Sequence, residues 1–277
     1  MTVAREMSEV ERWKSRVEAH DAQTERVRPP SASEDFWDTL ASSFREDPRR
    51  SDDPVVERLA EWVRPGTTVL DVGGGAGRYA LPLAVRGAAV TVVDPSPSMI
   101  EALRQAANDA GVSDLGVVEA GWEEADVEPA DVVFCANVVY FIADIEPFVR
   151  RLAERARRRA AILAYMKAPP SVASPLWEPV HGERRIDLPA LPELLPALWE
   201  MGIHPNVEMF PPSARRLMPS REAAAGWARR LLWVEPGSEK DLRLEAALDD
   251  LIEETPEGFT LRGARTRPQG LLWWSTA

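Results

Sequence analysis

The chain has 277 residues, 45% of them hydrophobic and 28% charged, so it can fold around a large hydrophobic core. Its formal net charge of −12 disfavours nucleic acid and anionic membranes as partners. A single cysteine, Cys135, excludes an internal disulfide, and there is neither a signal-like segment nor a membrane-spanning apolar run, so we expect a cytoplasmic protein.

The first 64 residues are predicted to be helical. Val10, Trp13 and Val17 recur at helical spacing, and the prolines that follow Arg28 end this helix. Two more helices are predicted, over residues 33–44 and from residue 53 onward. We expect residues 1–64 to form an N-terminal helical lid.

From residue 65 onward, short apolar runs alternate with helical periods. Strands are predicted over residues 67–72, 89–93, 116–118, 130–136 and 160–165. Helices are predicted over residues 77–86, 96–110 and 145–157, and the basic run from Arg155 to Arg159 is assigned to the end of the last one. Apolar strands separated by helices are typical of a parallel sheet covered on both faces.

The rest of the chain adds a proline-rich segment, a helical region and two late strands. Residues 167–202 are rich in proline and then helical over 191–201. Residues 207–210 and 270–274 are predicted strands. A helical insert at about 219–257 lies between them, and we expect it to cover one end of the sheet.

A glycine-rich loop follows the first strand of the sheet. Gly73, Gly75 and Gly77 fall where this strand turns into a helix, and side chains there would block both a tight turn and the approach of a ligand. Asp71 stands at the end of the strand. Asp94 ends the next strand, 21 residues after Gly73, where its carboxylate can accept both hydroxyl protons of a ribose.

Two cofactors compete for this loop. Residues 75–80 also fit the G-x-G-x-x-A pattern of NAD-binding proteins. Asp71 separates the two, because a carboxylate would repel a pyrophosphate but attract the ammonium and sulfonium groups of S-adenosylmethionine. The loop therefore favours S-adenosylmethionine.

Two stretches of the sequence resemble motifs of the class I S-adenosylmethionine-dependent methyltransferases. They are Asp71-Val72-Gly73-Gly74-Gly75-Ala76-Gly77 and Val92-Val93-Asp94-Pro95-Ser96-Pro97-Ser98-Met99. The resemblance covers roughly residues 65–166 and implies an α/β, Rossmann-like, doubly wound sheet of seven strands with the last strand antiparallel. It implies a cofactor-binding methyltransferase domain over 65–277, with the N-terminal helices and the helical insert forming a lid.

The same resemblance assigns side chains to the cofactor. It implies that Asp94 holds the ribose and that Pro95, Ser96 and Met99 line the adenosine. The segment around Trp122 is similar to the family's adenine-contacting segment, with Gly121 where many relatives carry an acid, so Trp122 or Glu123 is expected to make this contact. The motif at residues 135–140 is similar to the one that lies along the methionine part. The predicted cofactor residues are Asp71, Gly73, Gly75, Gly77, Asp94, Pro95, Ser96, Met99, Trp122, Glu123 and Asn137.

The expected reaction is methyl transfer from S-adenosyl-L-methionine to a small-molecule acceptor, with S-adenosyl-L-homocysteine as the product. The sulfonium already activates the methyl group, so catalysis is mostly positioning of the acceptor. His181 is the candidate base and Tyr140 a candidate orienting hydroxyl. The three histidines lack the spacing of a metal site. As a hypothesis, an apolar acceptor chamber is lined by some of the set Phe36, Trp37, Tyr140 and Trp177.

Other functions stay open at this point. An aminopropyl transferase usually has extra acids after the fourth strand, which residues 135–140 lack. An NAD-dependent oxidoreductase is disfavoured by Asp71, and an S-adenosylmethionine-binding protein without turnover would keep the same motifs. The sequence identifies neither the acceptor nor the methylated atom nor the oligomeric state.

Overall fold

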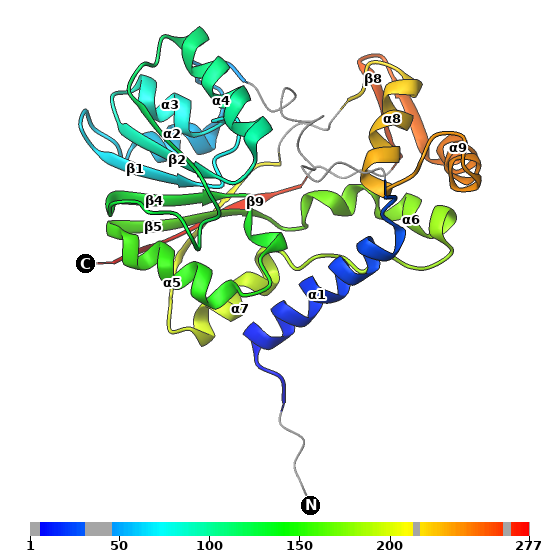
Figure 1. Ribbon diagram of the computed structural model, residues 1–277, viewed down its shortest axis with the longest axis horizontal. Coiled ribbons are helices and arrows are strands. Elements are labelled where there is room, and N and C mark those ends of the chain that lie inside the picture. Colours follow the sequence, from blue (N-terminus) through cyan, green and yellow to red (C-terminus); the bar gives the residue numbers. More distant parts are fainter. Residues whose placement is uncertain (1–5, 31–45, 213–216, 263–266, 277) are drawn as a thin grey trace, which may run out of the picture.

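The computed structural model describes residues 6–30, 46–212, 217–262 and 267–276, which fold around a seven-stranded sheet (Figure 1). The strand order is β3-β2-β1-β4-β5-β9-β6. The strands are β1 (Thr68–Val72), β2 (Ala89–Asp94), β3 (Leu115–Glu119), β4 (Ala130–Ala136), β5 (Ala156–Tyr165), β6 (Asn206–Phe210) and β9 (Gln269–Ser275). Within the described residues β9 is the sheet's one antiparallel strand, which confirms the predicted doubly wound sheet.

The strand order reverses next to β1. This strand pairs in parallel with β2 on one side and β4 on the other, with Asp71 opposite Val92 and Phe134. The carboxyl ends of these three strands therefore meet at one edge of the sheet. In open α/β sheets, ligands bind at such a reversal point.

Helices cover both faces of the sheet. One face carries α2 (Pro54–Ala60), α3 (Ala80–Val85) and α4 (Pro97–Ala110), and the other carries α1 (Glu9–Val27), α5 (Ile145–Arg155) and α7 (Leu191–Glu200) (Figure 1). Alternate residues of β4 pack into the hydrophobic cores on the two faces of the sheet. Val132 and Phe134 pack with α2, α3 and α4, whereas Val133 and Cys135 pack with α1, α5 and α7.

A separate helical unit stands beside one end of the sheet (Figure 1). It contains α6 (Ser174–His181), α8 (Arg221–Leu232), α9 (Glu239–Leu251) and a hairpin of β7 (Ile252–Thr255) and β8 (Gly258–Leu261). These elements bury a hydrophobic cluster of their own, which includes Trp177, Trp227 and Leu244. The helices of the insert agree with the sequence pattern, whereas the hairpin and α6 were not predicted.

Several predicted boundaries are wrong for local reasons. The helix after the glycine loop begins at Ala80 rather than at residue 77, because Gly75 and Gly77 have positive φ angles that no α-helix contains. The arginines at 157–159 belong to β5, because Ala156 takes an extended backbone at the end of α5 and pairs with Ala130. The helix predicted over 33–44 lies outside the described residues. Among the described helices, none combines the length and apolarity needed to cross a bilayer.

Candidate functional site

The glycine loop connects β1 to α3 and packs closely against the loop that follows β4. Gly73 has a φ of +67°, and a Cβ atom there would lie 2.4 Å from Cγ2 of Val138. A side chain at position 73 would therefore force the two loops apart. At Gly75, with φ +52°, a Cβ atom would meet Met99 and Asp94 only at ordinary contact distances of 3.5 Å and 3.9 Å. At position 75 it is therefore the backbone conformation, and not crowding, that favours glycine.

Asp94 ties the glycine loop to the end of β2. Its Oδ2 accepts the backbone N–H of Gly75 and its Oδ1 accepts that of Ser96, both at 2.9 Å. The Ser96 hydroxyl in turn accepts the N–H of Met99, at 3.2 Å, and caps α4. The structure thus brings together four residues predicted for the cofactor.

Asp71 is a buried carboxylate beside this loop. It is 1% exposed, and in the described part of the chain neither carboxylate oxygen has a hydrogen-bond partner. Burial raises the pKa of Asp71 to about 7, and the charge of Asp94 contributes to this increase. The nearby N–H of Ala80 lowers the pKa slightly, although it does not form a hydrogen bond with the carboxylate. A buried polar group without a partner is costly, so this carboxylate is a candidate partner for a cationic ligand.

The loop after β4 holds a residue in an uncommon conformation. Asn137 has a φ of +60°, and its N–H donates to the carbonyl of Leu163 at 2.8 Å. The Tyr140 hydroxyl, in the short helix η2 (Val139–Phe141), donates to Oδ1 of Asn137 at 2.9 Å and accepts the N–H of Tyr165 at 2.6 Å. Tyr140 is fully buried, and burial raises its pKa. Its hydroxyl therefore fixes the Asn137 loop to the carboxyl end of β5.

Three predicted cofactor residues lie after β2 and β3. The Trp122 ring is buried, with its N–H directed to the carbonyl of Phe148 at 3.4 Å and the Arg151 guanidinium 4.9 Å from the ring centre. Glu123 is exposed, and its Oε2 would lie 3.8 Å from a Cβ atom added to Gly121. Pro95 is exposed directly after Asp94. Glu123 thus offers an exposed carboxylate beside Gly121.

His181 ends α6 in the helical unit and is not among the residues gathered at the glycine loop. Its Nε2 lies 2.9 Å from the carbonyl of Leu232, and its ring packs on Trp177 with centroids 4.4 Å apart. Burial, followed by the charge of Lys240, lowers the pKa of His181 to about 4.

The hypothetical acceptor chamber is not assembled by its described members. Tyr140 packs in the core beneath the sheet, whereas Trp177 packs in the helical unit. Phe36 and Trp37 lie outside the described residues. Among the described residues, no group of three or more histidine, cysteine, aspartate or glutamate side chains is arranged to hold a metal ion.

Three polar side chains around the end of β5 and the segment that follows it were not predicted from the sequence. Tyr165 ends this strand, and the guanidinium carbon of Arg267 lies 5.1 Å from its ring centre. Arg185 lies between α6 and α7 and donates to the carbonyl of Pro170 at 3.0 Å. The place of Tyr165 follows from the predicted strand over 160–165, but the two arginines have no spacing signal.

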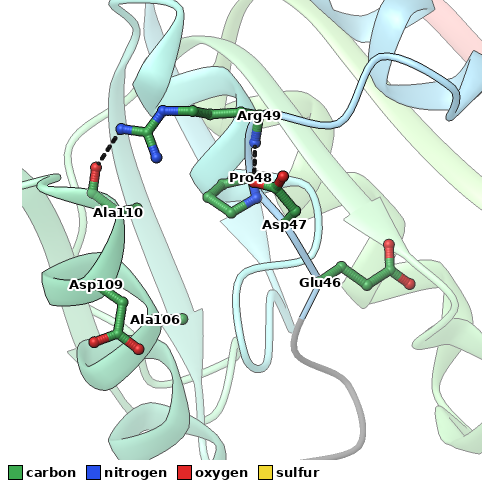
Figure 2. A pocket seen from close by; sticks show the side chains of 7 residues that line it. All are labelled: Glu46, Asp47, Pro48, Arg49, Ala106, Asp109 and Ala110. Carbon is green, nitrogen blue, oxygen red and sulfur yellow. Dashed lines mark hydrogen bonds between the residues drawn. The ribbon is translucent and has the colours of Figure 1, made fainter.

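A surface hollow of about 360 Å³ lies elsewhere, between residues 46–49 and the end of α4 (Figure 2). The Arg49 guanidinium crosses it and donates to the carbonyl of Ala110 at 2.8 Å. Its lining contains none of the residues predicted for the cofactor, so we do not assign it to the site.

Comparisons with known proteins match the central part of the chain. Residues 69–159 match a family model described as a methyltransferase domain. The ubiquinone biosynthesis O-methyltransferase of Methylocella silvestris is 46% identical over 57 residues, 21% of this chain and 22% of that protein. The enzyme of the same name from Azorhizobium caulinodans is 39% identical over 98 residues, 34% of this chain and 39% of that protein. The chain thus aligns with well under half the length of these relatives.

Solved structures share the fold over most of the chain. A methyltransferase from Geobacter sulfurreducens, crystallised with S-adenosyl-L-homocysteine, has a TM-score of 0.52 at 16% identity, covering 87% of this chain and 97% of that chain. One from Thiobacillus denitrificans, with the same molecule bound, has a TM-score of 0.52 at 17% identity, covering 87% and 98%. At this level of identity the match establishes the fold.

Proposed function

We propose that this chain, whose residues 69–159 match a methyltransferase domain, transfers a methyl group from S-adenosylmethionine to a small-molecule acceptor. The observation that carries this proposal is the buried carboxylate of Asp71, which has no hydrogen-bond partner and lies beside the glycine loop. The ammonium and sulfonium of S-adenosylmethionine would be favourable partners for it. A pyrophosphate would instead face the carboxylates of Asp71 and Asp94.

The residues around the loop fit this cofactor. Asp94, held by the N–H groups of Gly75 and Ser96, would accept the ribose hydroxyls. Asp71 would attract the cationic groups, and Asn137 would lie along the methionine part. Trp122 or Glu123 would contact the adenine, and Glu123 is the more exposed of the two. The remaining residues proposed to line the cofactor are Gly73, Gly77, Pro95, Ser96 and Met99.

When bound, the cofactor supplies a methyl group that is already activated. The chain's own residues then need to orient the acceptor and exclude water. We propose that Tyr140 acts by holding the Asn137 loop, since the protein already occupies its hydroxyl as donor and as acceptor.

His181 stays our candidate for removing an acceptor proton. A carbonyl can only accept, so the contact with Leu232 assigns the ring proton to Nε2 and the lone pair to Nδ1, which has no hydrogen-bond partner. With a pKa of about 4 it is neutral at physiological pH and is a base only for acidic protons.

We further propose that residues 1–64 and the insert at about 219–257 form the lid that selects the acceptor. We also propose a cytoplasmic location, supported by the buried free thiol of Cys135. The net charge of −12 supports a small molecule over nucleic acid as the acceptor.

Transfer of labelled methyl groups tests the proposal. The protein is incubated with methyl-labelled S-adenosylmethionine and a small-molecule cell extract, and the products are separated by chromatography. We expect label in a new low-mass product and a rate at least about 100-fold lower in Asp94→Ala, because one charged contact to the cofactor contributes about 3 kcal/mol. Asp126→Ala, at an exposed aspartate, serves as the matched control. Label that stays on the cofactor in every extract would contradict methyl transfer.

A further inference from the structure

Arg185 is a partly buried arginine without a carboxylate partner. Among the described residues it forms no ion pair within 4 Å, and its Nη1 donates to the carbonyl of Pro170 at 3.0 Å. Its guanidinium carbon lies 4.7 Å from the centre of the Trp177 ring. Burial lowers the pKa of Arg185 to about 10, which the charge of Asp187 only partly opposes, so the side chain is charged at neutral pH.

One edge of this guanidinium forms no hydrogen bond with the described residues. Nη1 donates to the carbonyl of Pro170, whereas the buried Nε has no hydrogen-bond partner and Nη2 forms no hydrogen bond within the described ranges. The Nε–Nη2 edge is one of the two that pair with a carboxylate through parallel hydrogen bonds. The indole N–H of Trp177 is likewise buried without a partner. The guanidinium and the indole ring on which it lies thus each have a buried donor without an acceptor, which points to an anion.

Helix α1 holds the segment that carries Arg185. Gln23 accepts the N–H of Ile186 at 2.8 Å and donates to the carbonyl of Arg184 at 2.9 Å. The His20 ring lies 2.6 Å from the carbonyl of Ile186. The backbone on both sides of Arg185 is therefore fixed, so binding of a ligand would cost little conformational entropy in this segment.

A chain of contacts connects this segment to the loop proposed for the cofactor. The Asn137 side chain accepts the Tyr140 hydroxyl, which accepts the N–H of Tyr165. The guanidinium of Arg267 lies over the Tyr165 ring and donates to the carbonyl of Pro169 at 2.8 Å. Pro169 directly precedes the residue to which Arg185 is anchored. Two arginines thus attach to one short helix, η3 (Pro169–Ala173), next to the carboxyl end of β5.

We propose that Arg185 binds a carboxylate of the methyl acceptor, which makes small carboxylic acids the substrate class. The proposal rests on the proposed methyltransferase function. The planar guanidinium of Arg185, with Nη1 bound to Pro170, can pair with a single carboxylate through its other edge. Arg267 adds a second positive charge nearby. The acid would be held at a point connected through Tyr165 and Tyr140 to the methyl-donor side of the site.

Calorimetry with matched neutral and charged probes tests this assignment. Benzoate and benzamide, which differ in charge but little in shape, are titrated into the protein with and without saturating S-adenosylhomocysteine. We expect benzoate to bind at least about tenfold more tightly than benzamide, equivalent to about 1.4 kcal/mol. Arg185→Met should abolish this preference and Arg185→Lys should keep part of it. Arg184→Met, at the exposed neighbour, should keep all of it.

Each remaining outcome counts against the proposal. Equal binding of the two probes, binding of neither, or a benzoate preference that survives Arg185→Met would overturn it. Phenyl phosphate binding more tightly than benzoate, with the same dependence on Arg185, would overturn the carboxylate class. The affinity for S-adenosylhomocysteine is measured separately. A protein that does not bind S-adenosylhomocysteine would contradict the methyltransferase function, while the benzoate titration without S-adenosylhomocysteine would still test Arg185. Arg185→Met must retain the wild-type circular dichroism spectrum, and Arg185→Lys provides the test if it does not.

Discussion

At the scale of single residues, the carboxylate of Asp71 links stability to pH. Its folded-state pKa of about 7 lies above the value of about 3.9 in an unfolded chain. Between these pH values the folded protein binds more protons than the unfolded one. The contribution of Asp71 to the free energy of unfolding is therefore fully present below about pH 4 and is lost as the pH rises through 7.

Asp71→Asn should therefore change stability in a pH-dependent way. Near pH 4 we expect its free energy of unfolding, measured in urea, to match that of the wild type. Above pH 8 it should exceed the wild type by about 2–4 kcal/mol, because the amide carries no charge to desolvate. Its affinity for S-adenosylhomocysteine should fall at the same pH. A difference that is largest at low pH, or that also occurs in Asp126→Asn, would contradict this.

Tyr140 gives a second test at the residue scale. Tyr140→Phe removes the donor to Asn137 and leaves the buried N–H of Tyr165 without its acceptor, so we expect a loss of about 1–3 kcal/mol in the free energy of unfolding. Affinity for S-adenosylhomocysteine should also fall, because the Asn137 loop loses its anchor. Tyr165→Phe is the matched control, since its hydroxyl has no hydrogen bond within the described residues. Equal effects of the two variants would exclude the anchoring role.

At the scale of elements, α1 braces the segment between α6 and α7. Gln23 is 1% exposed and supplies both a donor and an acceptor to that backbone. Gln23→Leu keeps the volume but removes both bonds, so we expect a loss of about 1–3 kcal/mol in urea unfolding and faster amide exchange at Ile186. Glu18→Ala, on the exposed side of the same helix, should change neither quantity. Unchanged exchange at Ile186 in Gln23→Leu would show that the brace is unimportant.

Elements of the sheet could be predicted because their signal is local. The apolar runs at residues 130–136 and 89–93 coincide with β4 and with most of β2, since buried parallel strands need apolar side chains on both faces. Helix α6 was missed because Pro175 and Pro179 weaken its pattern, and it forms where it packs against α9. The β7–β8 hairpin has a two-residue turn of Pro256 and Glu257, which lacks the Asn-Gly or Asp-Gly pair of common hairpin turns.

At the scale of the whole molecule, α1 connects the sheet to the helical unit. Trp13 and Val17 belong to the core beneath the sheet, whereas Val27, at the other end of the helix, packs against the helical unit (Figure 1). We expect Trp13→Ala to lower the free energy of unfolding by about 3–5 kcal/mol and to accelerate amide exchange in both β4 and α8. Trp199→Ala, at a residue 53% exposed, is the control. Acceleration confined to one unit would mean that the two unfold independently.

The site could be predicted only in part. The glycine spacing and the register of Asp94 follow from short motifs, and the structure brings Asp94, Gly75, Ser96 and Met99 together. The surroundings of Arg185 depend on contacts with α1 that are more than 150 residues away in the chain, such as that of Gln23 with Ile186, and no local pattern encodes them. Whether Trp122 or Glu123 contacts the adenine remains a prediction.

The central claim is that the loop between β1 and α3 holds a cationic adenosine derivative rather than a phosphate-bearing one. Titration calorimetry of the wild-type protein with S-adenosylmethionine, S-adenosylhomocysteine and NAD tests it most directly. We predict saturable binding of the first two, strongly weakened in Asp94→Ala, and no measurable binding of NAD. Saturable binding of NAD without binding of either nucleoside would contradict the account.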